Sequence, residues 1–394
     1  MVAFATLPEG SIDDRVRIVL GKGTGKEIFT FVDYEVKSGI IQQPSSFAVR
    51  FGQAATLANL QKEFPPGTPF ELRIGGVAQF TGFTDGFRNT GGASGSNLEL
   101  RGRDPLAMLF DAQVEFETSL NDATYADLVK DAMKAVGLDP QKLVYDHHDT
   151  RQIRAGVKVQ TISEPATGAE VTQQADGVHV RHVVHAKTGE SWLDFIQRHI
   201  ERAGLFLFAG PHGTLILGRP NGKQKPTYHF VRQRGKLRNA VNVLSHEYTF
   251  DTAHRFSEAV IYARIGGKKH GRGIVKGGFV DAEMEALGFK RKRVFRDANV
   301  QSSEQAELYA RRKIAEANRS SVSLVYTCQG HTAPSLVGGG RSVIIPDTVA
   351  RIDDEENGIK NDWYVENVTY HGGEATTTTL QMMRIQDLVF GKDS

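Results

Sequence analysis

A glycine-rich run near the start of the chain, Gly21-Lys22-Gly23-Thr24-Gly25-Lys26, has the residue types of a loop that binds nucleotide phosphates. The phosphate-binding pattern requires glycine just before this run and serine or threonine just after it, but the sequence has Leu20 and Glu27 there. The run also leads into strand-like residues, so the helix N-terminus that favours phosphate is missing. We therefore predict a hairpin turn and no nucleotide site.

Three histidines are spaced by three residues, at His179, His182 and His185, and His147-His148-Asp149 precedes them. Imidazole and carboxylate groups are ligands that zinc prefers. Valines surround the three histidines and favour a strand, in which His182 points to the face opposite the other two. The sequence thus favours solvated strand histidines over a metal site, and we predict no metal and no cofactor.

Two charged runs are candidate interaction surfaces. The basic run is Lys290, Arg291, Lys292 and Arg293, and the acidic run is Asp353, Asp354, Glu355 and Glu356. A basic run of this length can face DNA in a channel or an acidic partner, and the acidic run can complement it across a subunit interface. Ordinary solvated surface, with a hairpin loop for the acidic run, is the alternative that the sequence leaves open.

Patterns of covalent or acid–base catalysis are missing from the sequence. It contains no Gly-x-Ser-x-Gly elbow for a nucleophilic serine. Paired carboxylates such as Asp13-Asp14 fall in expected loops, where nothing indicates that they converge on a substrate. We therefore predict no catalytic residues and a protein that is not an enzyme.

Composition excludes several classes of protein. The chain of 394 residues has 48 basic and 46 acidic residues, so it lacks the basic surplus of a strongly electrostatic nucleic-acid binder. Its single cysteine, Cys328, cannot form an internal disulfide. The first residues do not have the pattern of a signal peptide, and no apolar run reaches the roughly 18 residues of a membrane helix. We predict a globular protein made in the cytoplasm, without membrane insertion.

The elements that position these residues begin with short strands. Residues 70–74 alternate between apolar and polar, Gly75-Gly76 marks a turn, and residues 77–83 and 98–101 follow as further strands. Many short strands with frequent turns are typical of a small barrel or sandwich.

Helical spacing then replaces strand alternation. One apolar stripe comprises Tyr125, Leu128, Val129, Ala132, Met133 and Val136, and a second comprises Trp192, Phe195, Ile196, His199, Ile200 and Ala203. Asn121 or Asp122 is expected to cap the first helix, and Gly137 to follow its last turn. We expect these two helices to belong to a small α/β domain with a loop-rich insertion at 151–185.

Strand patterns return in the last part of the chain. Ser302 followed by Gln305 is a capping-box pattern, which predicts a helix over 302–317. The glycine- and lysine-rich residues 266–278 are expected to form a loop. Strands are predicted at 342–345, 363–370 and 376–382, among others.

The two strand-rich regions share a pattern of turns and hairpins. We match residues 70–74, 80–82 and 98–101 with 342–345, 363–368 and 377–382, at a separation of about 270 residues. Chance similarity between hairpins is the alternative. If the match is an internal duplication, three copies of the chain in a closed ring present six similar units.

These patterns predict an α+β, β-rich fold. Two similar small β-barrel domains, over residues 1–111 and 236–394, flank an α/β insert domain over residues 112–235 with two amphipathic helices. The second barrel domain includes the helix at 302–317. If three such chains close into a ring, the domains assemble as a trimeric, pseudo-hexameric ring.

Several segments in this order resemble the baseplate hub proteins of phage Mu and other contractile tails, a family related to the hub part of spike proteins in other contractile injection systems. The segments are Gly189-Glu190-Ser191-Trp192, Glu201-Arg202-Ala203-Gly204-Leu205-Phe206, Gly213-Thr214-Leu215-Ile216-Leu217, Ser303-Glu304-Gln305-Ala306-Glu307-Leu308-Tyr309-Ala310-Arg311-Arg312 and Pro346-Asp347-Thr348-Val349-Ala350-Arg351-Ile352-Asp353-Asp354. The resemblance covers most of the chain and lies in the order of the segments, because no single motif is specific.

The resemblance implies a homotrimer that joins the sixfold tail tube to the threefold central spike and contacts other baseplate proteins. Its channel would pass DNA or an effector, and its place would be the virion's tail baseplate, assembled in the host cytoplasm. A phage, a bacteriocin and a cell-produced injection system all remain open. A carbohydrate-binding or adhesin module at the tail tip is an alternative, although Trp192 and Trp363, the only tryptophans, lie in segments expected to be buried. A tail-tip cell-wall enzyme is the third hypothesis.

Overall fold

Strands dominate the structure, a computed structural model, as predicted for a β-rich α+β chain. The residues that it describes are 14–21, 26–28, 31–41, 44–51, 62, 64–92, 95–115, 118–120, 124–145, 184–201, 205–220, 222–233, 243–265, 273–297, 300, 302–337 and 340–388. Residues 22–25 of the glycine-rich run, the segment 147–149, His179 and His182, and nearly all of the predicted 151–185 insertion lie outside the described residues.

The first β unit contains the described strands β1 (Val16–Leu20), β2 (Lys26–Ile28), β3 (Asp33–Gly39), β4 (Ser46–Phe51), β5 (Pro69–Ile74), β6 (Val77–Gly92) and β7 (Gly95–Arg103). They pair antiparallel in the order β3-β4-β7-β6-β5-β1-β2. Burial alternates along β1, because successive side chains of a strand point to opposite faces. β1 and β2 form the hairpin predicted for the glycine-rich run, and a strand follows that run, not a helix.

The second β unit contains β13 (Tyr228–Arg232), β14 (Val243–Phe250), β18 (Val322–Gln329), β21 (Thr348–Asp354), β22 (Ile359–Gly372) and β23 (Thr377–Arg384). Its order is β14-β18-β23-β22-β21-β13, and of these pairs only β13–β21 is parallel. Two short strands, β19 (Thr332–Pro334) and β20 (Arg341–Val343), form a separate pair, and a short 3₁₀ turn, η6 (Ile385–Asp387), follows β23.

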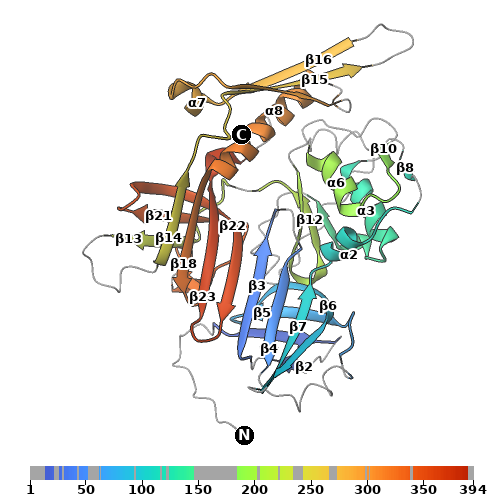
Figure 1. Ribbon diagram of the computed structural model, residues 1–394, viewed down its shortest axis with the longest axis vertical. Coiled ribbons are helices and arrows are strands. Elements are labelled where there is room, and N and C mark those ends of the chain that lie inside the picture. The colour runs from blue at the N-terminus through green and yellow to red at the C-terminus, as the bar shows by residue number, and fades with distance from the viewer. Residues whose placement is uncertain are drawn as a thin grey trace.

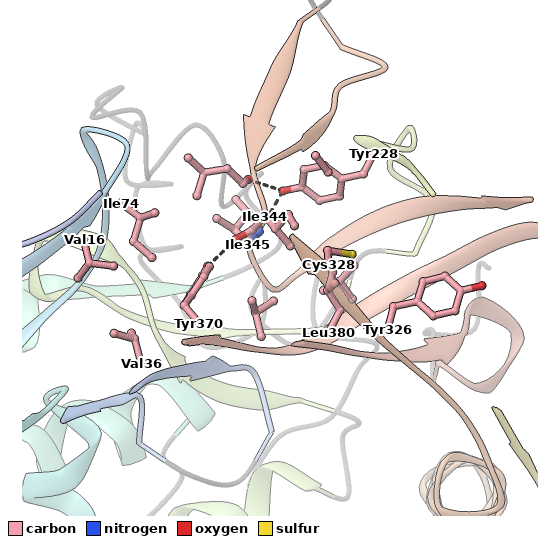
Figure 2. Packing of buried hydrophobic residues seen from close by; sticks show 14 of the residues in the cluster. Val16, Val36, Ile74, Tyr228, Tyr326, Cys328, Ile344, Ile345, Tyr370 and Leu380 are labelled. Carbon is pink, nitrogen blue, oxygen red and sulfur yellow. Dashed lines mark hydrogen bonds between the residues drawn. The ribbon is translucent and has the colours of Figure 1, made fainter. Parts of the chain in front are cut away.

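The two β units are joined edge to edge in one sheet (Figure 1). β22 pairs antiparallel with β3, from Asn367 opposite Gly39 to Gly372 opposite Tyr34. One hydrophobic cluster extends across this junction, with Val36 of the first unit near Tyr370 of the second (Figure 2). The predicted β-rich regions are therefore continuous in both hydrogen bonding and core.

The insert unit lies between the two β units in sequence. It contains α2 (Leu106–Asp111), β8 (Thr118–Leu120), α3 (Tyr125–Ala135), η2 (Pro140–Lys142), β9 (Leu143–Tyr145), β10 (Val184–Ala186), α6 (Trp192–Ile200), β11 (Phe206–Ala209), η4 (Pro211–Gly213) and β12 (Leu215–Gly218). Its helices pack on one another and on β9, β11 and β12, around a core separate from that of the sheet.

Both predicted helices of the insert unit are confirmed. The apolar stripe within α3 is buried at Tyr125, Leu128, Val129, Ala132 and Met133. The predicted cap was wrong: Thr124, not Asn121 or Asp122, accepts the backbone N–H of Asp127, and Asp127 returns a bond in a capping box. Gly137 has a φ of 76° after the helix, as expected for that position.

A third group of elements, the hairpin unit, projects from one end of the molecule (Figure 1). It contains β15 (Glu258–Ile265), β16 (Gly273–Val280), α7 (Ala282–Ala286), β17 (Lys292–Arg296) and α8 (Ser303–Ser321). The strands form their own sheet, β16-β15-β17, with α8 packed against it. Two predictions change here. β16 occupies part of the predicted loop 266–278, and the helix expected over 302–317 extends to Ser321 and packs on this separate sheet.

Candidate assembly surfaces

The two β units have the same strand order. β3-β4-β7-β6-β5 in the first corresponds to β14-β18-β23-β22-β21 in the second, with every pair antiparallel. In each unit the fourth strand of this order is the longest, and its pairing with the third is interrupted by one extra residue. That residue is Asp85 in β6 and Glu366 in β22. A bulge at the same place in both units is a specific feature, because bulges set the local bend of a strand.

The turns before β5 and β21 also match. They are Pro66-Gly67-Thr68 and Pro346-Asp347-Thr348, and the middle residue has a φ of 87° in the first and 58° in the second. Its N–H donates to the neighbouring long strand, 2.7 Å from the oxygen of Thr84 and 2.9 Å from that of Val365. In both turns the threonine hydroxyl donates to the carbonyl three residues earlier, at 2.6 and 2.7 Å.

This correspondence corrects the match made from the sequence. The counterpart of β5 is β21, which starts at Thr348, and not the predicted segment 342–345. Pro346 lacks an N–H and Asp347 is left-handed, so the chain cannot continue as one strand from β20 into β21. β20 pairs with β19 instead.

A buried polar cluster lies at the junction of the β units. His331 has no exposed surface, and its Nε2 is 2.7 Å from the hydroxyl of Tyr34 on β3. Its Nδ1 is 2.8 Å from the hydroxyl of Thr378 on β23, which itself donates to the carbonyl of Gly330 at 2.7 Å. The Thr378 hydroxyl must then accept from Nδ1–H, which leaves Nε2 to accept from Tyr34.

Burial sets the protonation of this cluster. Burial, and then the nearby charge of His371, lower the pKa of His331 to about 4, while burial raises the pKa of Tyr34 to about 12. Both side chains are therefore neutral at pH 7. Sequence reasoning missed the pair, because its members are separated by 297 positions and neither belongs to a local motif.

Tyrosine hydroxyls fix the loop that ends at β21. Tyr228 donates to the carbonyl of Val343 at 2.7 Å and accepts the N–H of Ile345 at 3.0 Å, while Tyr370 donates to the carbonyl of Ile344 at 2.5 Å (Figure 2). These bonds satisfy buried backbone groups at the end of β20 and in the two residues that follow it. They hold residues 343–345 against the core on which both β units pack.

The basic run lies at and just before β17, one of the two edge strands in the described sheet of the hairpin unit, and all four side chains are exposed. Arg291 donates to the carbonyl of Thr252 at 2.6 Å, and Lys292 pairs with Glu258 at 2.6 Å. The guanidinium of Arg293 lies 5.5 Å from the ring centre of Phe295. Charge on an exposed edge strand also discourages strand addition by other chains.

The acidic run lies where β21 turns into β22, and its members differ in environment. Asp354 is 1% exposed and accepts from Arg232 at 2.9 Å and from the hydroxyl of Tyr326 at 2.6 Å. Burial raises the pKa of Asp354, but its hydrogen bonds and the charge of Arg232 outweigh burial, so the pKa lies below its ordinary value. Asp354 therefore ties β13 to this hairpin, which leaves Glu355 and Glu356 as the exposed members.

The structure does not bring the two charged runs together: no hydrogen bond or ion pair between described residues joins them. Among the same residues, no group of three or more histidine, cysteine or acidic side chains could hold a metal ion. No described helix is long and apolar enough to cross a membrane. Trp363 is buried and Trp192 is half-buried, so neither presents an open stacking surface.

The arrangement of strands is shared with phage tail proteins. A tail protein from Neisseria meningitidis MC58 matches with a TM-score of 0.70 at 19% sequence identity, over 93% of this chain and 95% of that chain. The 43 kDa tail protein of prophage MuSo2 from Shewanella oneidensis matches with a TM-score of 0.68 at 16% identity, over 95% of this chain and 99% of that chain. The chain has the fold of these tail proteins.

A component of a secretion system has a similar fold. The E. coli c3393 protein, a component of the type VI secretion system with structural similarity to the T4 bacteriophage tail proteins gp27 and gp5, matches with a TM-score of 0.54 at 10% identity, over 93% of this chain and 76% of that chain. The sequence itself matches no protein-family model and no curated protein. The resemblance inferred from the order of segments is thus confirmed at the level of the fold.

Proposed function

We propose that the chain is the structural hub of a contractile-tail baseplate, a homotrimeric ring that adapts the sixfold tail tube to the threefold central spike. The observation that supports this most is the presence of two β units with the same strand order in one chain. Three copies then present six similar units, which is the geometry that a sixfold partner requires. The fold shared with the two tail proteins supports the same assignment.

In this proposal the ring continues the channel of the tail tube, through which DNA or an effector passes. The domains over residues 1–111 and 236–394 supply the ring units, and the insert domain over 112–235 lies beside them. Other baseplate proteins bind the outside of the ring, and the protein becomes part of the virion after assembly in the host cytoplasm. No catalytic step is assigned to it.

The charged runs are proposed as contacts within this assembly. Lys290, Arg291, Lys292 and Arg293 lie on an exposed edge and suit an acidic neighbour or the passing DNA. Glu355 and Glu356 are exposed and suit a basic neighbour, and Glu356 also pairs with Arg232 of its own chain, as the buried Asp354 does. Rim charges of this kind affect the rate and salt dependence of association more than its strength.

The test is the mass and shape of the purified chain. Light scattering should give three times the chain mass of 43.3 kDa, and electron-microscopy class averages should show a ring with pseudo-sixfold outline. A preparation that stays monomeric at every concentration, and forms no ring when tail tube protein is added, would contradict the proposal.

A further inference from the structure

The two strands that meet at the β3–β22 junction each have a counterpart in the other β unit, and the corresponding edges of these counterparts are unpaired among the described strands. β3 corresponds to β14, and the paired stretch of β22 corresponds to residues 86–91 of β6. Among the described strands, β14 pairs only with β18, and β6 beyond its bulge pairs only with β7. Each β unit therefore has the same two strand edges. Among the described strands, the edges of β3 and β22 pair with each other, whereas the edges of β14 and of residues 86–91 in β6 have no partner strand.

The open edge of β14 carries apolar side chains on its core side. Tyr248 and Phe250 stand opposite Leu324 and Val322, which are fully buried, and opposite residues of an antiparallel pair share a face. Yet Tyr248 is 36% exposed and Phe250 is 45% exposed. Their counterparts on β3, Val36 and Ser38, are buried because β22 covers that edge.

The open edge of β6 has a matching pattern. Phe87 and Asn89 stand opposite the buried Leu100 and Leu98, so they also face the core side. Phe87 is half-buried and packs on the main hydrophobic cluster, while the following residues of the strand are exposed. An additional strand at this edge would extend the cluster in the same way that β3 extends it at β22.

We infer that β14 of one copy adds to β6 of the next copy, in the register of the internal β3–β22 junction. This inference rests on the proposed ring and names the contact that closes it. The transferred register places Phe250 opposite Phe87, Tyr248 opposite Asn89, and Glu247 diagonal to Arg88 on the outer face. Aromatic and opposite-charge cross-strand pairs both stabilise a sheet.

One detail of packing supports this register. In the internal junction Gly39 stands opposite Asn367, and a Cβ on Gly39 would overlap the side-chain oxygen of Asn367. The transferred register places Asp251 opposite Gly86, so a glycine again faces a residue with a polar branched side chain. Both junctions thus have one glycine at the equivalent pair of positions. The glycine belongs to β3 in the internal junction and to β6 in the inferred one.

Paired cysteines test the contact in the full-length chain. Residues directly opposite in an antiparallel pair have Cβ atoms about 4.5–5.5 Å apart, which is close to the range of a disulfide. Chains with both Phe87→Cys and Phe250→Cys should therefore give covalent dimers and trimers, and nothing larger, after mild oxidation. The native Cys328 is buried and burial raises its pKa to about 12, so it stays unreactive.

Matched controls separate this register from others. Phe87→Cys with Thr249→Cys puts the second thiol on the opposite face and should not cross-link. Phe250→Cys alone should not cross-link either, and covalent dimers from this single variant would overturn the inference in favour of β14 pairing with itself. A trimer by light scattering that resists cross-linking through Phe87 and Phe250 would also overturn it, while leaving the proposed ring intact.

A second variant tests the energetics without cross-linking. Phe250→Asp places a carboxylate in the contact and should raise the concentration needed for trimer formation by about tenfold or more. Ile274→Asp, at an apolar residue of β16 that is 70% exposed, is the control and should leave this concentration unchanged. Equal behaviour of the two variants would overturn the inference, and a wild-type chain that never trimerises would overturn the proposed function with it.

Discussion

The buried His331 makes stability depend on pH in a direction that can be worked out. The ordinary pKa of histidine is about 6.5, and burial in the folded chain lowers the pKa of His331 to about 4. Between these values the unfolded chain binds a proton that the folded chain does not. Stability contributed by this site is therefore complete above about pH 6.5 and is lost as the pH falls toward 4.

The size of the effect follows from the gap between the two pKa values. At about 1.4 kcal/mol per pH unit, the gap corresponds to about 3 kcal/mol of unfolding free energy. The same loss should weaken the pairing of β3 with β22, because His331 joins Tyr34 and Thr378 across the region where the two β units meet.

The assay compares the urea unfolding of His331→Gln with that of the wild-type chain. Circular dichroism monitors the unfolding, and the protein concentration is the same for both chains. At pH 7.5 the variant should be less stable, because it loses a ring that packs among Tyr34, Thr378 and Tyr370. At pH 4 the difference should be smaller by about 3 kcal/mol, since glutamine takes up no proton. His254→Gln, at an exposed histidine, serves as the control. Parallel pH profiles for His331→Gln and wild type would refute the reasoning.

Three further predictions use the same unfolding assay. Burial raises the pKa of Asp104 to about 7, so stability is lost as the pH rises from about 4 to 7, and Asp104→Asn should remove this decline. Gly102→Ala places a methyl carbon about 2.6 Å from a ring carbon of Phe47 and should cost about 1–3 kcal/mol. Arg232→Met leaves the carboxylate of Asp354 buried without its cation and should cost about 3 kcal/mol.

Matched variants make these three predictions decisive. Arg351→Met breaks an exposed pair with Asp362 and should cost no more than about 1 kcal/mol, so an equal cost for Arg232→Met would contradict the role given to burial. Gly278→Ala adds a methyl that meets its neighbours at 3.4 Å, an ordinary contact, and should be better tolerated than Gly102→Ala. An Asp104→Asn profile identical to wild type would show that Asp104 ionises freely.

The sequence predicted the elements that depend on neighbouring residues alone, such as helices with one buried face, helix caps and alternating strands. The stripe from Tyr125 to Met133 was readable because a helix repeats its buried face every three to four residues. Ser302 was correctly identified as a cap, since its hydroxyl accepts the N–H of Gln305. Alternation likewise identified β5, where one face is buried.

The sequence contains no comparable pattern that shows which distant strands pair with each other. β3 and β22 lie at opposite ends of the chain, and nothing in either sequence specifies the other as its neighbour. The internal match paired β6 with β22 and β7 with β23 correctly, but it misplaced the counterpart of β5, for a related reason. Asp347 adopts the left-handed conformation that glycine adopts at Gly67, so the turn that marks the start of β21 does not look like its counterpart.

In the candidate charged runs, too, the local sequence indicated the exposed residues but not the residue that depends on a distant partner. The exposure of Lys290 and Arg291 agrees with what a run of like charges usually indicates. Asp354 does not follow this expectation, because it lies on the inward face of β21, two residues after the buried Ile352. Period-two alternation along 352–354 would have identified it as inward-facing, but a buried aspartate also needs Arg232, which comes from a distant strand.

The link between β3 and β22 also bears on the kinetics of assembly. This contact forms whenever a single chain folds, whatever the concentration. A ring of six separate subunits needs five association steps, whereas the proposed ring of three double-unit chains needs two, so the yield of the three-chain ring falls far less steeply on dilution. Covalent tethering would therefore let rings nucleate while the protein is still scarce in the cell.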